Sequence, residues 1–228
     1  MFMEVCATGT LPDGSPSAYG TIPTSWFDTV FRAVGSMANT LPPVTPSSPY
    51  LSTPMDRATE ALGSKTNMDA MVLLHEGTNG VKGALFGLNS PLNIDTFTKL
   101  IVNNLKDPEI WLTWLHNGIA VSRYLQDEIV SAKFDGILDA VTAQHEFIDT
   151  YALGADHYAD RWREFVPVHL AQVQQHAVGW LIERVITTTR LYDNLHPENY
   201  GEVMATLNAI ITDIQDWKIP SSWIPGAG

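Results

Sequence analysis

Proline is unevenly distributed along this chain, and no other sequence feature constrains the fold as much. Eight of the 14 prolines lie within residues 1–66 of the 228, and five of those lie between Leu41 and Pro54. Each proline removes a backbone donor and biases the preceding residue toward extended conformations. We therefore expect residues 1–66 to form an extended N-terminal arm, rich in Pro, Ser and Thr, that contains one short amphipathic helix.

The amphipathic helix of the arm is expected to begin at Ser25, a candidate N-cap. The apolar residues that follow at helical spacing are Trp26, Phe27, Val30, Phe31 and Val34. A second short helix is plausible after Thr53, because Pro54 suits a first helical position and Gly63 suits a helix end.

Beyond residue 66 the apolar residues recur mostly at helical spacing. We expect helices after Asn93 and Asp107, from about Ala132 to Leu153, as a short turn from Asp156 to Phe165, from Pro167 to Tyr192, and after His196. The glycine-containing stretch before them offers a possible short strand at Val81–Phe86. The prediction is an all-α fold: a multi-helix, bundle-like core over residues 67–216, followed by an irregular C-terminal tail over residues 217–228.

Composition excludes several classes of protein. The chain has 13 Lys and Arg against 25 Asp and Glu, a net charge of −12, so a free-standing nucleic-acid-binding domain is not expected. Its single cysteine, Cys6, excludes an intramolecular disulfide framework and a thiolate zinc site. We find no signal peptide and no stretch long and apolar enough to span a membrane, so we expect a cytoplasmic or particle-associated protein.

The best candidate for metal chemistry is a group of three residues on one predicted helix, His145, Glu146 and Asp149. Spacings of three and four residues allow their side chains to share a face. The order His-Glu-x-x-Asp nevertheless differs from the His-Glu-x-x-His zinc motif, and no matching Glu-x-x-His occurs on another predicted helix. A core histidine beside two solvated acids explains the pattern more simply. We expect no cofactor.

Other polar patterns are weaker still. A row of residues seven apart lies on the predicted helix over residues 167–192, and its members are His169, His176, Glu183 and Arg190. Ligands two turns apart lie about 10 Å from one another, so one metal ion cannot bind both. A solvated or interfacial stripe is the simpler interpretation. His157 and Asp160 are most simply a cluster at a helix start, and Glu76–Gly83 lacks the pattern of a phosphate-binding loop.

Two functions remain. The first is a structural, self-assembling protein, such as a coat, capsid, shell or filament subunit, that forms a homo-oligomer with arm exchange. Aromatic residues are its expected subunit contacts, and these are Trp26, Phe27, Phe31, Tyr50 and Trp223. The arm can instead lie on its own core. The alternative is a small helical metal-dependent enzyme or ligand-binding protein that uses His, Asp and Glu side chains.

Overall fold

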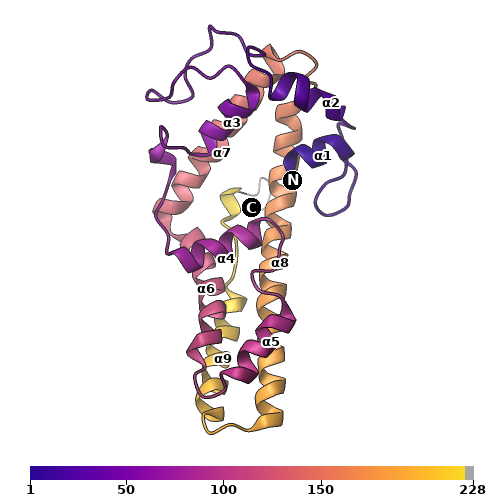
Figure 1. Ribbon diagram of the computed structural model, residues 1–228. Helices are drawn as coiled ribbons and strands as arrows, with labels where there is room; N and C mark the ends of the chain where they lie inside the picture. Colours follow the sequence, from indigo (N-terminus) through magenta and orange to yellow (C-terminus); the bar gives the residue numbers. More distant parts are fainter. Residues whose placement is uncertain (224–228) are drawn as a thin grey trace. The chain divides into compact units, whose positions relative to one another are not determined.

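The computed structural model describes residues 1–223 and shows an all-α protein (Figure 1). Across these residues it has no strand, and the only β-type pairing is an isolated bridge between Thr10 and Pro16. This confirms the all-α character that the sequence predicts. No helix in the same residues combines the length and apolar character needed to cross a membrane.

The helices follow one another along the chain with short connections, except for the long connections before α2, α3 and α4. The bounds are α1 Phe2–Thr8, α2 Thr24–Trp26 continued by a π-helical turn Phe27–Phe31, α3 Pro54–Leu62, α4 Glu76–Phe86, α5 Ile94–Asn103, α6 Glu109–Gln126, α7 Glu128–Tyr151, α8 Tyr158–Leu195 and α9 Tyr200–Gln215. Single 3₁₀ turns occur at Met68–Ala70 and Ser221–Trp223.

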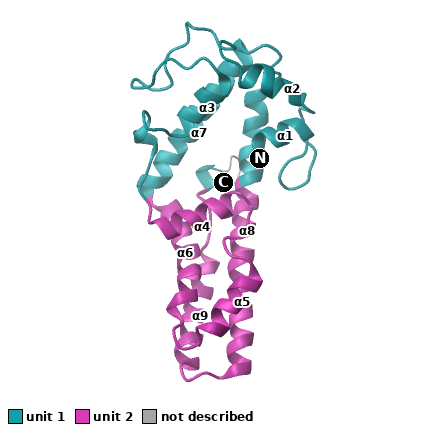
Figure 2. Ribbon diagram, in the orientation of Figure 1, with its two compact units in different colours: residues 1–73, 128–169, 221–228 teal, residues 74–127, 170–220 magenta. Residues whose placement is uncertain are grey.

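The chain forms two compact units (Figure 2). Unit 1 comprises residues 1–73, 128–169 and 221–228, and unit 2 comprises residues 74–127 and 170–220. The segment expected to be an arm therefore shares a unit with the middle of the chain. Residues 224–228 of the expected tail lie outside the described residues.

Unit 1 is held together by aromatic residues of the N-terminal segment. Trp26, Phe27 and Phe31 are buried and belong to a cluster that also contains Ile148 of α7 and Tyr158 of α8. α3 packs along α7 in the same unit. Burying several large side chains in one cluster supplies the main favourable free energy for such a fold.

Unit 2 is built from α4, α5, α6, α9 and most of α8. Five apolar residues on one side of α8 are buried, as the periodicity predicts, and these are Leu170, Val173, Ala177, Leu181 and Val185. Trp217, from the expected irregular tail, is also buried, and its indole Nε1 donates to the Gly118 carbonyl of α6 at 3.0 Å.

Two predicted helix starts are confirmed in detail. The Thr53 hydroxyl accepts a hydrogen bond from the Asp56 amide at 2.9 Å, and α3 begins at Pro54 and ends before Gly63. The Asn93 side chain accepts from the Thr96 amide at 2.8 Å at the start of α5. These caps are recognisable from sequence because they satisfy backbone donors within the same turn.

Other local predictions are wrong. Val81–Phe86 is not a strand but the second half of α4, which packs on α6. The helix expected to begin at Ser25 begins instead at Thr24, with Pro23 as its N-cap. α1 was not expected at all, and no side-chain cap marks its start.

α8 is one continuous helix of 38 residues, although the sequence predicts a break before Pro167. Pro167 lacks the amide that would donate to the Arg163 carbonyl, and in water this normally interrupts a helix. Here the apolar side chains on both sides of the proline are buried, including Phe165, Val166 and Leu170. Packing therefore outweighs the local cost of the proline.

Candidate functional site

The three candidate metal ligands each have a different environment in unit 1. His145 is 2% exposed and lies among aromatic rings, stacked on Phe2 at a centroid distance of 5.3 Å and edge-on to Tyr158 and Trp162. Burial lowers its pKa to about 3, so the imidazole is neutral at physiological pH. Its Nδ1 is buried without a hydrogen-bond partner among the described residues.

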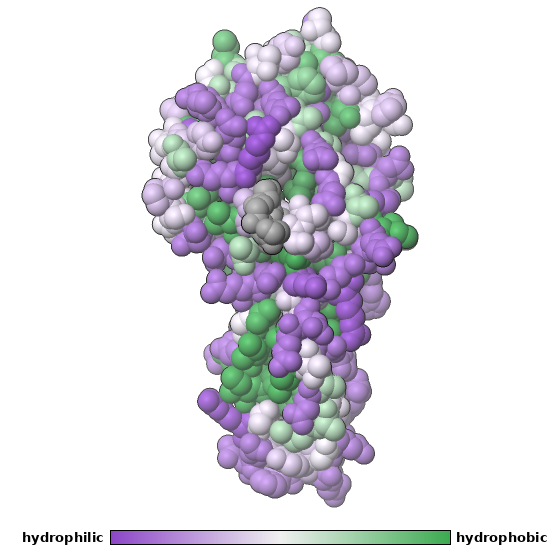
Figure 3. Space-filling model, turned by 180° about the vertical axis from the view of Figure 1, so that it is seen from behind, coloured by the Kyte–Doolittle hydropathy of each residue, from purple (hydrophilic) through white to green (hydrophobic). Residues whose placement is uncertain are grey.

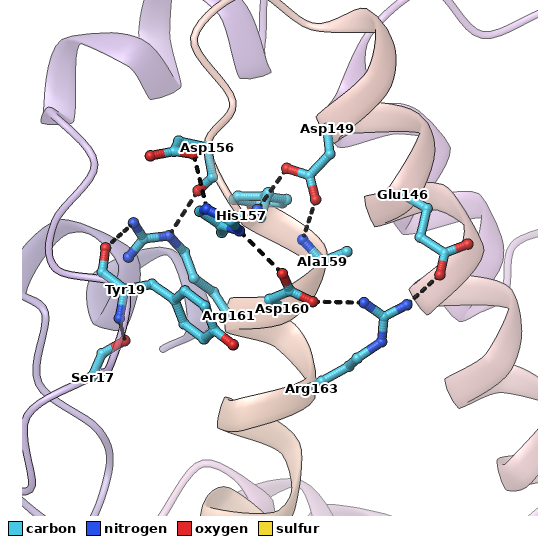
Figure 4. Close-up of polar contacts among 11 residues, drawn as sticks. Ser17, Tyr19, Glu146, Asp149, Asp156, His157, Ala159, Asp160, Arg161 and Arg163 are labelled. Carbon is cyan, nitrogen blue, oxygen red and sulfur yellow. Dashed lines mark hydrogen bonds and ion pairs between the residues drawn. The ribbon is translucent and has the colours of Figure 1, made fainter.

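Glu146 and Asp149 serve contacts to α8 (Figure 4). Glu146 pairs with Arg163, and both side chains are about half exposed. The Asp149 carboxylate accepts hydrogen bonds from the amides of Tyr158 at 2.6 Å and Ala159 at 2.9 Å. A carboxylate in this position satisfies two of the unpaired amides at the N-terminus of α8 and interacts favourably with the helix dipole.

These three side chains thus belong to one helix but have separate partners. In residues 1–223 no group of three or more His, Cys, Asp or Glu side chains is placed to hold a metal ion. The weaker pair, His157 and Asp160, lies at the start of α8 with its ring nitrogen and carboxylate 3.1 Å apart (Figure 4). The hydrogen bond from His157 lowers the pKa of the Asp160 carboxyl.

The N-terminal segment is attached to α8 by hydrogen bonds as well as by aromatic packing. Arg161, 3% exposed, donates to the backbone carbonyls of Tyr19 and of Gly20, the latter at 2.7 Å. Glu164 accepts from the Ser17 hydroxyl at 2.6 Å and the Ala18 amide at 2.8 Å. Arg161 and Glu164 therefore form a clamp on residues 17–20, part of which is visible in Figure 4.

The aromatic residues expected at subunit contacts lie mostly inside the single chain. Trp26 is buried, and its indole donates to the Leu153 carbonyl at 2.8 Å. Phe27 and Phe31 are buried beside it. Trp223 is 1% exposed and stacks on Phe134 with centroids 3.9 Å apart. Tyr50 alone among the five is exposed, at 48%.

The row of residues seven apart on α8 does not form one site. His169 stacks on Phe165 in unit 1. In unit 2, His176 contacts the Asn89 carbonyl at 3.1 Å and Glu183 pairs with Arg184.

Alongside them, Ile182 and Ile186 are each 43% exposed, and a Cβ added at Gly179 would meet nothing within 4 Å. We name Gly179, Ile182 and Ile186 the α8 surface. Figure 3 shows apolar side chains gathered on one face of unit 2.

A larger apolar surface lies on unit 1, and the sequence analysis did not identify it. Its members are Leu62 (55% exposed), Met68 (70%), Met71 (58%), Leu73 (99%) and Ile129 (68%). We name these five residues the methionine surface. The sequence shows this stretch only as an apolar run without clear helical period, so nothing in it separates exposed from buried positions.

Three distances relate the segments that carry the methionine surface. A Cβ added at Gly63, which follows Leu62, would lie 3.4 Å from the Met71 side chain. The Lys133 ammonium donates to the Asp69 carbonyl at 2.9 Å and contacts the Met71 carbonyl at 3.5 Å. Ile129 is one helical turn before Lys133 and therefore lies on the same face of α7.

No protein-family model, curated protein or solved structure matches this chain.

Proposed function

We propose that this chain is a structural, self-assembling protein, such as a coat, capsid, shell or filament subunit, and that its copies meet through the methionine surface. One observation carries the proposal: five large apolar side chains of unit 1 are exposed, four of them within residues 62–73 and the fifth at the start of α7, which contacts the 3₁₀ turn Met68–Ala70 of that stretch. Scattered apolar residues are normal on a protein surface, whereas a contiguous group indicates an interaction site. Methionine suits such contacts because its flexible thioether adapts to the facing surface.

The local charge favours a second copy as the partner. The chain carries a net charge of −12, so two copies repel each other over most of their surfaces. The charged residues within residues 62–73 and 127–133 are Lys65, Asp69, Asp127, Glu128 and Lys133, two basic and three acidic. These stretches therefore carry a small part of the total charge, and a pair related by a twofold axis places the same weakly charged apolar surface on both sides of the contact.

A second contact is needed for assembly beyond a dimer, and the α8 surface of unit 2 supplies it. Ile182 and Ile186 lie one turn apart beside Gly179, where the absence of a side chain lets another helix approach closely. A chain with one self-pairing surface stops at a dimer. With one such surface on each unit, every copy has two neighbours and association continues.

The proposal also includes arm exchange, in which residues 1–66 of one copy pack on the core of a neighbouring copy. Trp26, Phe27 and Phe31 fix the N-terminal segment to α7 and α8 across more than a hundred residues of sequence. The same contacts form between neighbouring subunits if residues 1–66 extend from one bundle-like core to the next. Exchange of an identical element between protomers needs no new contact surface.

The methionine surface is tested by replacing its two central side chains together, Met71→Ser and Leu73→Ser. Each is more than half exposed within the chain, so the monomer keeps its stability. Removing a buried leucine from a contact costs about 1.5–3 kcal/mol, and therefore weakens self-association at least about tenfold. Analytical ultracentrifugation over a range of concentrations measures this change.

The matched control is Val34→Ser. Val34 is 87% exposed on the same unit but lies outside the methionine surface. The Val34→Ser substitution should leave the self-association constant unchanged. Equal association of the double variant and the unmodified chain would exclude this surface as the contact, and equal weakening by both variants would show that the effect is general.

A second candidate function, a ligand-binding protein, is favoured by one observation. Unit 1 has a cavity of about 310 Å³ lined by Asp135 and Asp139 among other residues. A metal-dependent enzyme has less support, because His145, Glu146 and Asp149 have separate surroundings. Elemental analysis of the purified chain tests the metal-dependent enzyme. A stoichiometric metal ion that is lost in the His145→Ala variant would support this function.

A further inference from the structure

The cavity of unit 1 lies between α7, the first turns of α8 and the 3₁₀ turn at Ser221–Trp223. Its apolar lining includes Leu138, Val166 and Pro167 together with two indoles, Trp162 and Trp223. At about 310 Å³ it falls at the small end of the range for ligand pockets. A cavity of this size and lining accepts a compact, largely apolar molecule.

The lining of the cavity has more carboxylates than cations, Asp135 and Asp139 against Arg163. Asp135 and Asp139 line it, one turn apart on α7, and like charges at this spacing disfavour each other. Among the described residues neither carboxylate forms an ion pair, and the one hydrogen-bond partner of the two is the Ser222 hydroxyl, 3.5 Å from Asp135.

Two basic side chains, Arg163 in the lining and Lys133 earlier on α7, already have partners. The Arg163 guanidinium, which also lines the cavity, lies between Asp160 and Glu146 and pairs with both (Figure 4). The Lys133 ammonium donates to the Asp69 carbonyl. Pro167, which also lines the cavity, has no backbone amide. The Arg163 carbonyl therefore lacks its usual helical hydrogen bond, and this wall of the cavity has one donor fewer. Two carboxylates and aromatic walls, beside one arginine that is already paired with Asp160 and Glu146, are complementary to a positively charged ligand.

We propose that this cavity binds a small organic ammonium ion. Its charge would lie by Asp135 and Asp139 and its carbon groups against Trp162, Trp223 and Leu138. An ammonium group over an indole face gains about 0.5–2 kcal/mol, and the paired carboxylates add to this. A bare inorganic cation would leave the apolar walls unfilled.

The test uses calorimetric titration of the full chain with choline and with 3,3-dimethylbutan-1-ol, its uncharged carbon isostere. Choline should bind at one site, and the isostere should bind at least tenfold more weakly. Asp139→Asn should weaken choline binding about tenfold or more. Indole Nε1–H resonances of the full chain should shift on adding choline.

The control is Glu198→Gln, which removes one negative charge from an exposed position of unit 2. It should leave choline binding unchanged, and circular dichroism confirms that both variants fold. Binding of choline that survives Asp139→Asn, equal binding of the uncharged isostere, or no binding of choline at millimolar concentration would each overturn the proposal.

Discussion

At the scale of single residues, buried polar groups of unit 1 contact the N-terminal segment. His145 is enclosed by Phe2, Tyr158 and Trp162, and Arg161 binds the backbone of residues 19 and 20. Burial raises the pKa of the neighbouring Cys6 thiol to about 12, so this thiol stays protonated and unreactive.

His145 should make the stability of unit 1 depend on pH. Its pKa is about 3 in the folded chain, below the ordinary value of 6.5, so the unfolded chain binds a proton first as pH falls. Stability from this group is complete above pH 6.5 and is lost toward pH 3, by up to about 1.4 kcal/mol per pH unit. Urea unfolding at pH 7 and pH 5 measures the loss. His145→Phe should reduce this loss of unfolding free energy between pH 7 and pH 5. The control His116→Gln, at an exposed position, should leave the loss unchanged. An unchanged pH dependence in His145→Phe would contradict the account.

The Arg161 clamp should be necessary for attaching residues 1–20. Arg161→Ala leaves the carbonyls of Tyr19 and Gly20 without donors, which costs about 2–4 kcal/mol. Limited proteolysis should then cleave the first 20 residues faster. Arg32→Ala removes only an exposed pair with Asp28 and should cost less than about 1 kcal/mol. Equal protease resistance of both variants would show that the clamp is dispensable.

At the scale of elements, sequence patterns identify helices where the determinants are local. Thr53 and Asn93 mark helix starts because each cap bonds an amide three residues later. α4 was missed because its glycines weaken helix propensity, and its stability comes from packing on α6, including a hydrogen bond from Thr78 to Asn117 at 2.9 Å. Such a contact between distant segments has no local signal.

The glycines of α4 and α6 should respond in opposite ways to substitution by alanine. A Cβ at Gly80 or Gly83 meets nothing within 4 Å, so alanine should stabilise α4 by about 0.5–1 kcal/mol at each position. A Cβ at Gly118 would lie 2.8 Å from the Leu181 side chain and 2.9 Å from Trp180, and should destabilise unit 2 by about 1–3 kcal/mol. Thermal unfolding of the single variants compares them; a neutral Gly118→Ala would show that this contact relaxes freely.

The candidate sites were predictable only in part for the same reason. Sequence spacing correctly places His145, Glu146 and Asp149 on one helix. It does not show that Arg163 and the amide of Tyr158 occupy two of them, because those partners come from α8. The methionine surface was missed because exposure depends on what covers a residue, and that is decided by the fold.

At the scale of the whole molecule, the account rests on association of identical chains. The net charge of −12 opposes contact in general, and under the proposed function the exposed apolar side chains of the methionine surface and of the α8 surface are where contact is favourable. Raising the ionic strength screens the repulsion and leaves burial of apolar area in place. Assembly should therefore increase with salt, as turbidity or light scattering across a sodium chloride series would show; assembly that falls with salt would indicate contacts between opposite charges instead.

The most direct measurement is the native mass of the unmodified chain by multi-angle light scattering over a range of concentrations, with electron micrographs of the same samples. One chain has a mass of 25.1 kDa. We predict masses many times this value that rise with concentration, together with regular particles or filaments in the micrographs. A mass of one chain at every concentration, with no ordered objects visible, would contradict the proposed function.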